Sequence, residues 1–170
     1  MRVDINGVRP GSTFESLLKT IGFVVVQWGH CEQSLELIVN TLHGNFGGNS
    51  LPRRRRMPRP VSEKVAFLGE CAEQLPSLVD FRSRLEALAI DFGEVTQLRH
   101  DLVHGALSDE PIKDGVFTFI RLDARPDTHE VKTFEYDLKR FPILEAALVK
   151  LGATAPKLGR DLFDARPGKS

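Results

Sequence analysis

One short stretch, Arg99-His100-Asp101-Leu102-Val103-His104-Gly105, combines the side chains that phosphate chemistry needs. An arginine binds phosphate oxygens through several N–H groups, and a histidine exchanges protons near neutral pH. Arg99 interrupts an apolar helical pattern, and His104 ends that pattern just before a glycine. On an ideal helix the two side chains are about 140° apart, so they converge only if the arginine bends across or the last turn unwinds. The stretch is therefore a candidate catalytic site.

Two other interpretations of this stretch stay open. His100 and His104 are four residues apart with Asp101 between them, which is similar to the spacing of two zinc ligands on a protease helix. No third ligand has a matching spacing among the remaining candidates: Cys31, Cys71, His30 and His43. We therefore expect no metal and no cofactor. In a purely structural role, His104 would contact the carbonyls at the helix end and His100 would simply be exposed.

The elements around the stretch are predicted from hydrophobic spacing and from caps. Ser12 and Glu15 form a capping box that opens a helix of about 30 residues. Its apolar seam runs through Phe14, Leu18, Ile21, Val25, Trp28, Glu32, Leu35, Val39 and Leu42. Further helices are predicted over 62–75, over 81–104 and from about 137, where Pro156 kinks or ends the last one. Residues 116–122 and 131–136 predict a β-hairpin. The fold class is mainly α: an antiparallel four-helix bundle with a hairpin inserted before the last helix.

Two charged residues interrupt the two best helical seams. Glu32 and Arg99 each lie 18 residues after the first phenylalanine of their seam, Phe14 and Phe81 respectively. If the two helices are parallel, both charges lie at a similar height, and buried charges are costly unless paired. We expect Glu32 to contact Arg99, directly or through water. In the alternative, each charge marks a point where its seam turns toward solvent.

Composition limits the possible classes of protein. The 170 residues contain 23 basic and 23 acidic side chains, so no global positive charge attracts nucleic acid. Apolar runs are far shorter than the roughly 20 residues that span a bilayer, and a cytoplasmic protein without membrane contact is expected. We predict one domain over 1–165, with the hairpin at about 115–136 and a flexible tail at 166–170. A Gly-, Asn- and Pro-rich loop carries a basic run that is either solvated or an RNA-backbone contact: Arg53, Arg54, Arg55, Arg56 and Arg59.

The stretch LRHDLVHG resembles the signature of the HEPN superfamily, whose domains are small helical bundles. That signature is an arginine, a polar residue and a histidine four to six positions after the arginine, which Arg99, His100 and His104 match. Trp28-x3-Glu32 and the segment PVSEKVAFL at 60–68 are also similar to HEPN-type domains. The resemblance covers roughly residues 12–105, and the hairpin lies outside the minimal bundle.

The resemblance implies a metal-independent endoribonuclease that works as a homodimer with a composite site. His104 would be the acid/base, Arg99 the phosphate clamp, His100 an orienting or assisting group and Glu32 a support for the guanidinium. The product would carry a 2′,3′-cyclic phosphate. Active members are often toxins or defence proteins, so an antitoxin protein is an implied partner. The alternative is a non-catalytic helical module that binds RNA or a protein.

Overall fold

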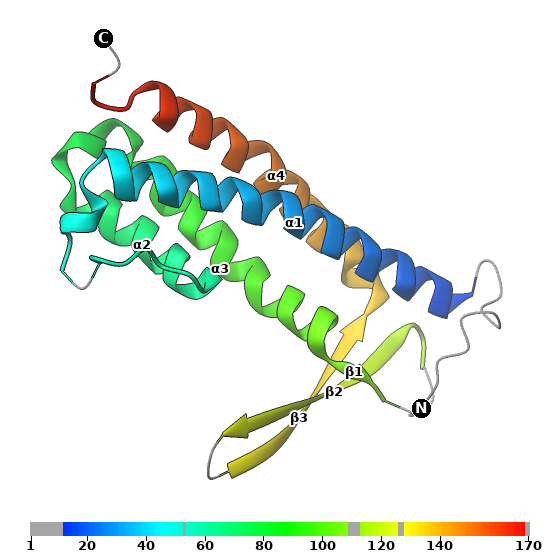
Figure 1. Cartoon of the computed structure of the whole chain (residues 1–170). Coiled ribbons are helices and arrows are strands. Elements are labelled where there is room, and N and C mark those ends of the chain that lie inside the picture. Colours follow the sequence, from blue (N-terminus) through cyan, green and yellow to red (C-terminus); the bar gives the residue numbers. More distant parts are fainter. Residues whose placement is uncertain (1–11, 53, 109–112, 126–127, 169–170) are drawn as a thin grey trace. The chain divides into compact units, whose positions relative to one another are not determined.

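The computed structural model describes residues 12–52, 54–108, 113–125 and 128–168 (Figure 1). The chain is mainly α, as predicted. The four helices are α1 (Thr13–Asn45), α2 (Val61–Gln74), α3 (Arg82–His104) and α4 (Phe141–Asp164). Short 3₁₀-helices are η2 (Gly48–Ser50), η3 (Pro76–Phe81) and η4 (Leu138–Arg140). Strands β1 (Ala106–Leu107), β2 (Val116–Arg125) and β3 (Thr128–Asp137) precede the last helix. The antiparallel bundle itself stays a prediction.

The chain divides into two compact units, each built from segments that are distant in sequence. Unit 1 comprises Met1–Val26 and Gln97–Ala146, and unit 2 comprises Gln27–Thr96 and Ala147–Ser170. Unit 1 therefore contains the first half of α1, the last two turns of α3 and the whole sheet. Unit 2 contains α2, η3 and the larger parts of α3 and α4.

Helix α1 begins as its cap predicts, but its buried stripe in unit 1 differs from the predicted seam. The Ser12 hydroxyl accepts a hydrogen bond from the backbone N–H of Glu15 at 3.1 Å. The buried positions there are Leu17, Thr20 and Val24, whereas the predicted seam residues Leu18 and Val25 are 38% and 47% exposed. The Thr20 hydroxyl donates to the carbonyl of Ser16, so this polar group is satisfied within the stripe. From Trp28 onward the seam is correct, with Leu35, Val39 and Leu42 buried.

Unit 2 has an apolar core in which Trp28 is buried. Trp28 is 2% exposed and meets Phe92 edge-to-face, with ring centroids 5.8 Å apart. Cys31 and Cys71 are buried in the same unit, as expected of core residues. Burial raises the pKa of Cys31 to about 11 and that of Cys71 to about 12, so both remain thiols at neutral pH. Helix α4 continues past Pro156 to Asp164, so this proline does not end it.

Unit 1 is built around a three-stranded antiparallel sheet in the order β1-β2-β3. The predicted hairpin is present, and its strands reach further into the insert 123–128 than the sequence indicated. A short third strand, β1, was not predicted. One face of the sheet buries Phe117, Phe119 and Tyr136, and the rings of Phe119 and Phe134 stack at 5.2 Å. Alternation leaves Leu122 and Val131 exposed on the opposite face.

The junction between α3 and β1 leaves no room for a side chain. The N–H of Gly105 donates to the carbonyl of Asp101 at 2.9 Å, and β1 begins at the next residue. A Cβ atom at Gly105 would lie 2.6 Å from that carbonyl oxygen and 3.0 Å from the Phe134 ring. The expected C-cap glycine is thus needed for space, since its φ is not in the left-handed region.

We predict that Gly105→Ala lowers the free energy of unfolding by about 1–3 kcal/mol, because a methyl group must be forced into this junction. Gly93→Ala is the matched control. Gly93 lies in the exposed interior of the same helix with no described atom within 4 Å of a Cβ, and alanine there favours the helix by up to about 1 kcal/mol. Urea unfolding followed by circular dichroism measures both. Equal effects of the same sign would contradict the account.

Candidate functional site

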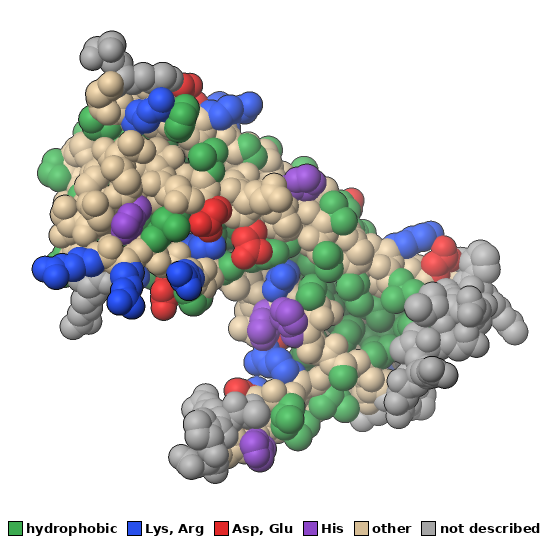
Figure 2. All heavy atoms as spheres, in the orientation of Figure 1, with side chains coloured by type: hydrophobic (Ala, Val, Ile, Leu, Met, Phe, Trp, Pro, Cys, Tyr) green, Lys and Arg blue, Asp and Glu red, His purple; other side chains and the backbone are tan. Residues whose placement is uncertain are grey.

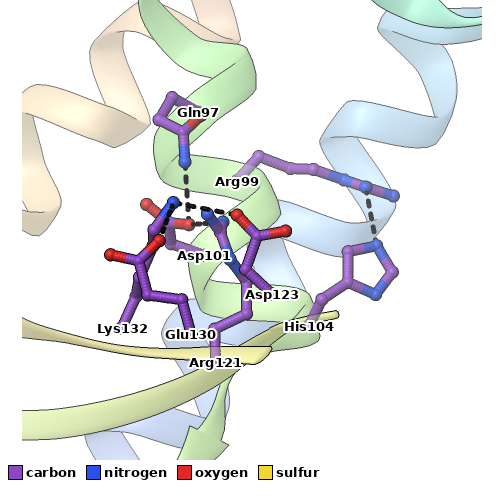
Figure 3. A network of polar contacts seen from close by, with 8 residues as sticks. All are labelled: Gln97, Arg99, Asp101, His104, Arg121, Asp123, Glu130 and Lys132. Carbon is purple, nitrogen blue, oxygen red and sulfur yellow. Dashed lines mark hydrogen bonds and ion pairs between the residues drawn. The ribbon is translucent and has the colours of Figure 1, made fainter. Parts of the chain in front are cut away.

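The last two turns of α3 bring Arg99 and His104 together (Figure 3). The Nη1 atom of Arg99 lies 3.2 Å from Nε2 of His104. The helix remains α-helical through His104, so the contact forms because the long arginine side chain bends across the surface. A guanidinium can only donate hydrogen bonds, so Nε2 accepts and the proton of the neutral ring resides on Nδ1.

His100 lies against His104 on the same helix face. The two ring centroids are 4.8 Å apart with an interplanar angle of 52°, and Figure 2 shows an adjoining pair of histidine side chains at the surface. The pKa of His100 is lowered first by partial burial and then by the nearby charges of Arg121, His104 and Arg99, while Asp101 opposes them. His100 is therefore mostly neutral at pH 7 and able to accept a proton.

Asp101 connects this helix end to the sheet. Its Oδ1 atom accepts hydrogen bonds from Nε2 of Gln97 at 2.8 Å and from Nη1 of Arg121 on β2 (Figure 3). The side chains of Arg121 and Asp101 are 22% and 18% exposed, so the ion pair is partly shielded from water. In the sequence, Asp101 was considered only within the zinc-like pattern of His100 and His104, and Arg121 was not singled out. The missing information is the pairing register, which brings together residues 20 positions apart.

Glu32 belongs to unit 2, whereas Arg99 belongs to unit 1. The carboxylate of Glu32 accepts a hydrogen bond from the indole N–H of Trp28 at 3.1 Å, one helical turn before it. This contact joins the two residues of the Trp28-x3-Glu32 pattern and satisfies the polar atom of the buried tryptophan. The contact between Glu32 and Arg99 stays a prediction.

The arginine run is not uniform. Arg53 lies outside the described residues. The guanidinium of Arg54 binds both carboxylate oxygens of Glu70 at 2.6 and 2.5 Å, and its backbone carbonyl lies 3.0 Å from Nε2 of His43. Arg54 therefore anchors the loop to α2. Among the described residues of the run, Arg55, Arg56 and Arg59 are exposed, and the first two line an open hollow beside η2.

A second hollow of about 520 Å³ lies in unit 2 between α3 and α4. Leu88 and Leu158 lie among its apolar lining residues, and two ion pairs, Arg84–Asp161 and Asp91–Lys150, border it at 2.6 and 2.7 Å. Most of its basic groups are thus neutralised by acidic neighbours, with Lys157 the lining cation for which no ion pair is described. Such a balanced surface is poorly suited to a polyanion.

The described residues contain no cluster of three or more histidine, cysteine or acidic side chains that could hold a metal ion. Within the same residues, every helix is too short or too polar to cross a bilayer. Comparisons with models of protein families, with curated proteins and with solved structures found no match.

The Arg54–Glu70 pair generates a pH-dependent prediction. The hydrogen bonds from Arg54 hold the pKa of the Glu70 carboxyl below its usual value of 4.5. The ion pair therefore stabilises the fold fully above pH 4.5, and this stabilisation is lost as the pH falls through the lowered pKa of Glu70. We expect Glu70→Gln to reduce the free energy of unfolding by about 1–2 kcal/mol at pH 7. This difference in stability between the wild type and the variant should shrink toward pH 3. Glu63→Gln, on the exposed face of the same helix, is the control. A deficit that is constant from pH 7 to pH 3 would refute the pairing.

Proposed function

We propose that this protein is a metal-independent endoribonuclease of the HEPN type, folded as an antiparallel helical bundle. The observation that supports this proposal most is the 3.2 Å contact between the Arg99 guanidinium and the His104 imidazole. It places a phosphate-binding cation and a proton-transfer group on one exposed surface, with a second imidazole beside them. No metal is required, because RNA carries its own nucleophile in the 2′-hydroxyl.

The chemistry assigned to these side chains is an internal transfer at phosphorus. A neutral imidazole takes the proton of the 2′-hydroxyl as that oxygen bonds to phosphorus. The bond from phosphorus to the 5′-oxygen breaks, and the departing oxygen takes a proton from a protonated imidazole. The products are a 2′,3′-cyclic phosphate and a 5′-hydroxyl. Arg99 turns from Nε2 of His104 to the phosphoryl oxygens and stabilises the charge that develops on them. This frees Nε2, and His104 is then the acid/base.

The pair of histidines suits the two proton transfers of this reaction. His100 is mostly neutral at pH 7 because its pKa is lowered, so it can assist as a proton acceptor. In a homodimer a second copy would supply another arginine and another pair of histidines to a composite site. An antitoxin protein that covers this site is the partner we propose for a cytoplasmic toxin or stress effector.

A non-catalytic module that binds RNA or a protein is the alternative. That function would need His104 only as a helix-end residue. Its described contact is with the Arg99 side chain rather than with a terminal carbonyl, which favours the enzyme.

We expect RNA cleavage to persist in EDTA and to fall at least about 100-fold in Arg99→Ala and in His104→Ala, since each variant removes a group that acts in the transition state. Arg84→Ala and His30→Ala are matched controls, because both replace exposed side chains of unit 2. Cleavage rates of a fluorescent RNA under single-turnover conditions measure the effect. Equal activity in all five proteins would indicate a contaminating nuclease and contradict the assignment.

The arginine run is proposed to bind the RNA backbone through its exposed members. Replacing Arg55, Arg56 and Arg59 together by glutamine should flatten the plot of log affinity against log salt by about 2, since each contact on a single strand contributes about 0.7. The control replaces the same number of charges in the hollow between α3 and α4: Arg84, Lys150 and Lys157. Fluorescence anisotropy with a labelled RNA gives both slopes. An equal change of slope in both triple variants would exclude a specific role for the loop.

A further inference from the structure

The pairing of the short strand β1 with β2 determines the position of Arg121 relative to the end of α3. Ala106 pairs with Ile120 and Leu107 with Phe119 in an antiparallel register. Continued back by one residue, this register puts Arg121 opposite Gly105, at the C-terminal end of α3. Because Gly105 leaves no room for a Cβ atom, the strand and the helix end are held close together.

The side chain of Arg121 is then fixed by Asp101. The carboxylate of Asp101 accepts from Arg121 and also from Gln97, one helical turn earlier (Figure 3). About four fifths of each ion-pair side chain is shielded from solvent, so this contact is less screened than an open surface pair. Asp101 and His104 lie three residues apart on α3, so their side chains are neighbours on the helix surface. The ring of His104 lies 4.8 Å from that of His100, and the anchored guanidinium is therefore close to the pair of histidines.

We propose that Arg121 is a positioning residue of this site: held by Asp101, it ties the last turn of α3 to the sheet and places a permanent positive charge beside His100. The inference rests on the proposed function, because it names a further residue for the same reaction. On this inference the sheet contributes a residue, Arg121, that positions the site.

The charged and titratable groups that face His100 come from two elements. Arg121 is on β2, and the others, Arg99, Asp101 and His104, are on α3. The guanidinium of Arg121 opposes protonation of His100, whereas the carboxylate of Asp101 favours it. Removing the charge of Arg121 should therefore raise the pKa of His100 and leave less of the proton-accepting form near neutral pH.

The test is a titration of the histidine ring signals by NMR in the full chain, without RNA. We expect the pKa of His100 to rise in Arg121→Gln and to stay near the wild-type value in Arg121→Lys, which keeps the charge. Lys132→Gln is the matched control. Lys132 is the cross-strand partner of Arg121 and is paired with Asp123 and Glu130 at 2.8 and 3.4 Å. It should leave the pKa of His100 unchanged.

The pH dependence of kcat/KM supplies a second readout. The acid limb should move to higher pH in Arg121→Gln but not in Lys132→Gln, which a purely structural role of Arg121 would not produce. Arg121→Met keeps the apolar stem and repeats the test if the glutamine variant does not fold. An unchanged pKa of His100, or an equal rise in Lys132→Gln, overturns this inference alone. A wild-type protein that titrates as expected but does not cleave RNA overturns the proposed function and leaves the link between Arg121 and His100 intact.

Discussion

A guanidinium that donates to an imidazole is the interaction on which the functional account depends. Arg99 carries a permanent charge, so its contact with Nε2 of His104 defines which ring nitrogen holds the proton. The contact forms while α3 stays helical through His104, five residues after the arginine. The chain leaves the helix at the next residue, where the lack of a Cβ atom at Gly105 leaves room for the Asp101 carbonyl and the Phe134 ring.

The sheet also holds the C-terminal end of α3 in place, through the ion pair between Arg121 and Asp101. Residues on β2 and β3 bury three aromatic side chains on one face, and the same register carries Arg121 to Asp101. Burial of the aromatic face supplies the stability, and the ion pair supplies orientation. Together they bring two arginines to the helix end that carries the pair of histidines: Arg99 contacts His104, and Arg121 contacts Asp101. Desolvation and the neighbouring positive charges both lower the pKa of His100 and so favour its neutral, proton-accepting form.

Much of the fold could be predicted because its signals are local. The Ser12 cap, the apolar spacing in unit 2 and the β-branched runs of the hairpin depend only on neighbours in sequence. The helix α1 was predicted correctly, but the seam expected to be buried in its first half was wrong, because two adjacent stripes there are both apolar and the buried one includes Thr20. Periodicity cannot choose between such stripes, since the choice depends on what covers each one.

The candidate site was less accessible to sequence reasoning. The motif itself could be found, because Arg99, His100 and His104 lie within six residues. The pairs Asp101–Arg121 and Arg54–Glu70 join residues 20 and 16 positions apart, and no local pattern encodes them. Nothing in the run of arginines distinguishes Arg54 from its neighbours until Glu70 is placed beside it.

The most direct measurement of the central claim is the chemical nature of the cleaved ends. A DNA oligonucleotide with a single ribonucleotide offers one 2′-hydroxyl, and mass spectrometry of the products in EDTA identifies the new ends. The account predicts a single cut after the ribonucleotide, with a 2′,3′-cyclic phosphate on one fragment and a 5′-hydroxyl on the other. Cleavage at deoxynucleotides, or products with a 3′-hydroxyl and a 5′-phosphate, would show that water or another nucleophile attacks, and would contradict the mechanism assigned to Arg99 and His104.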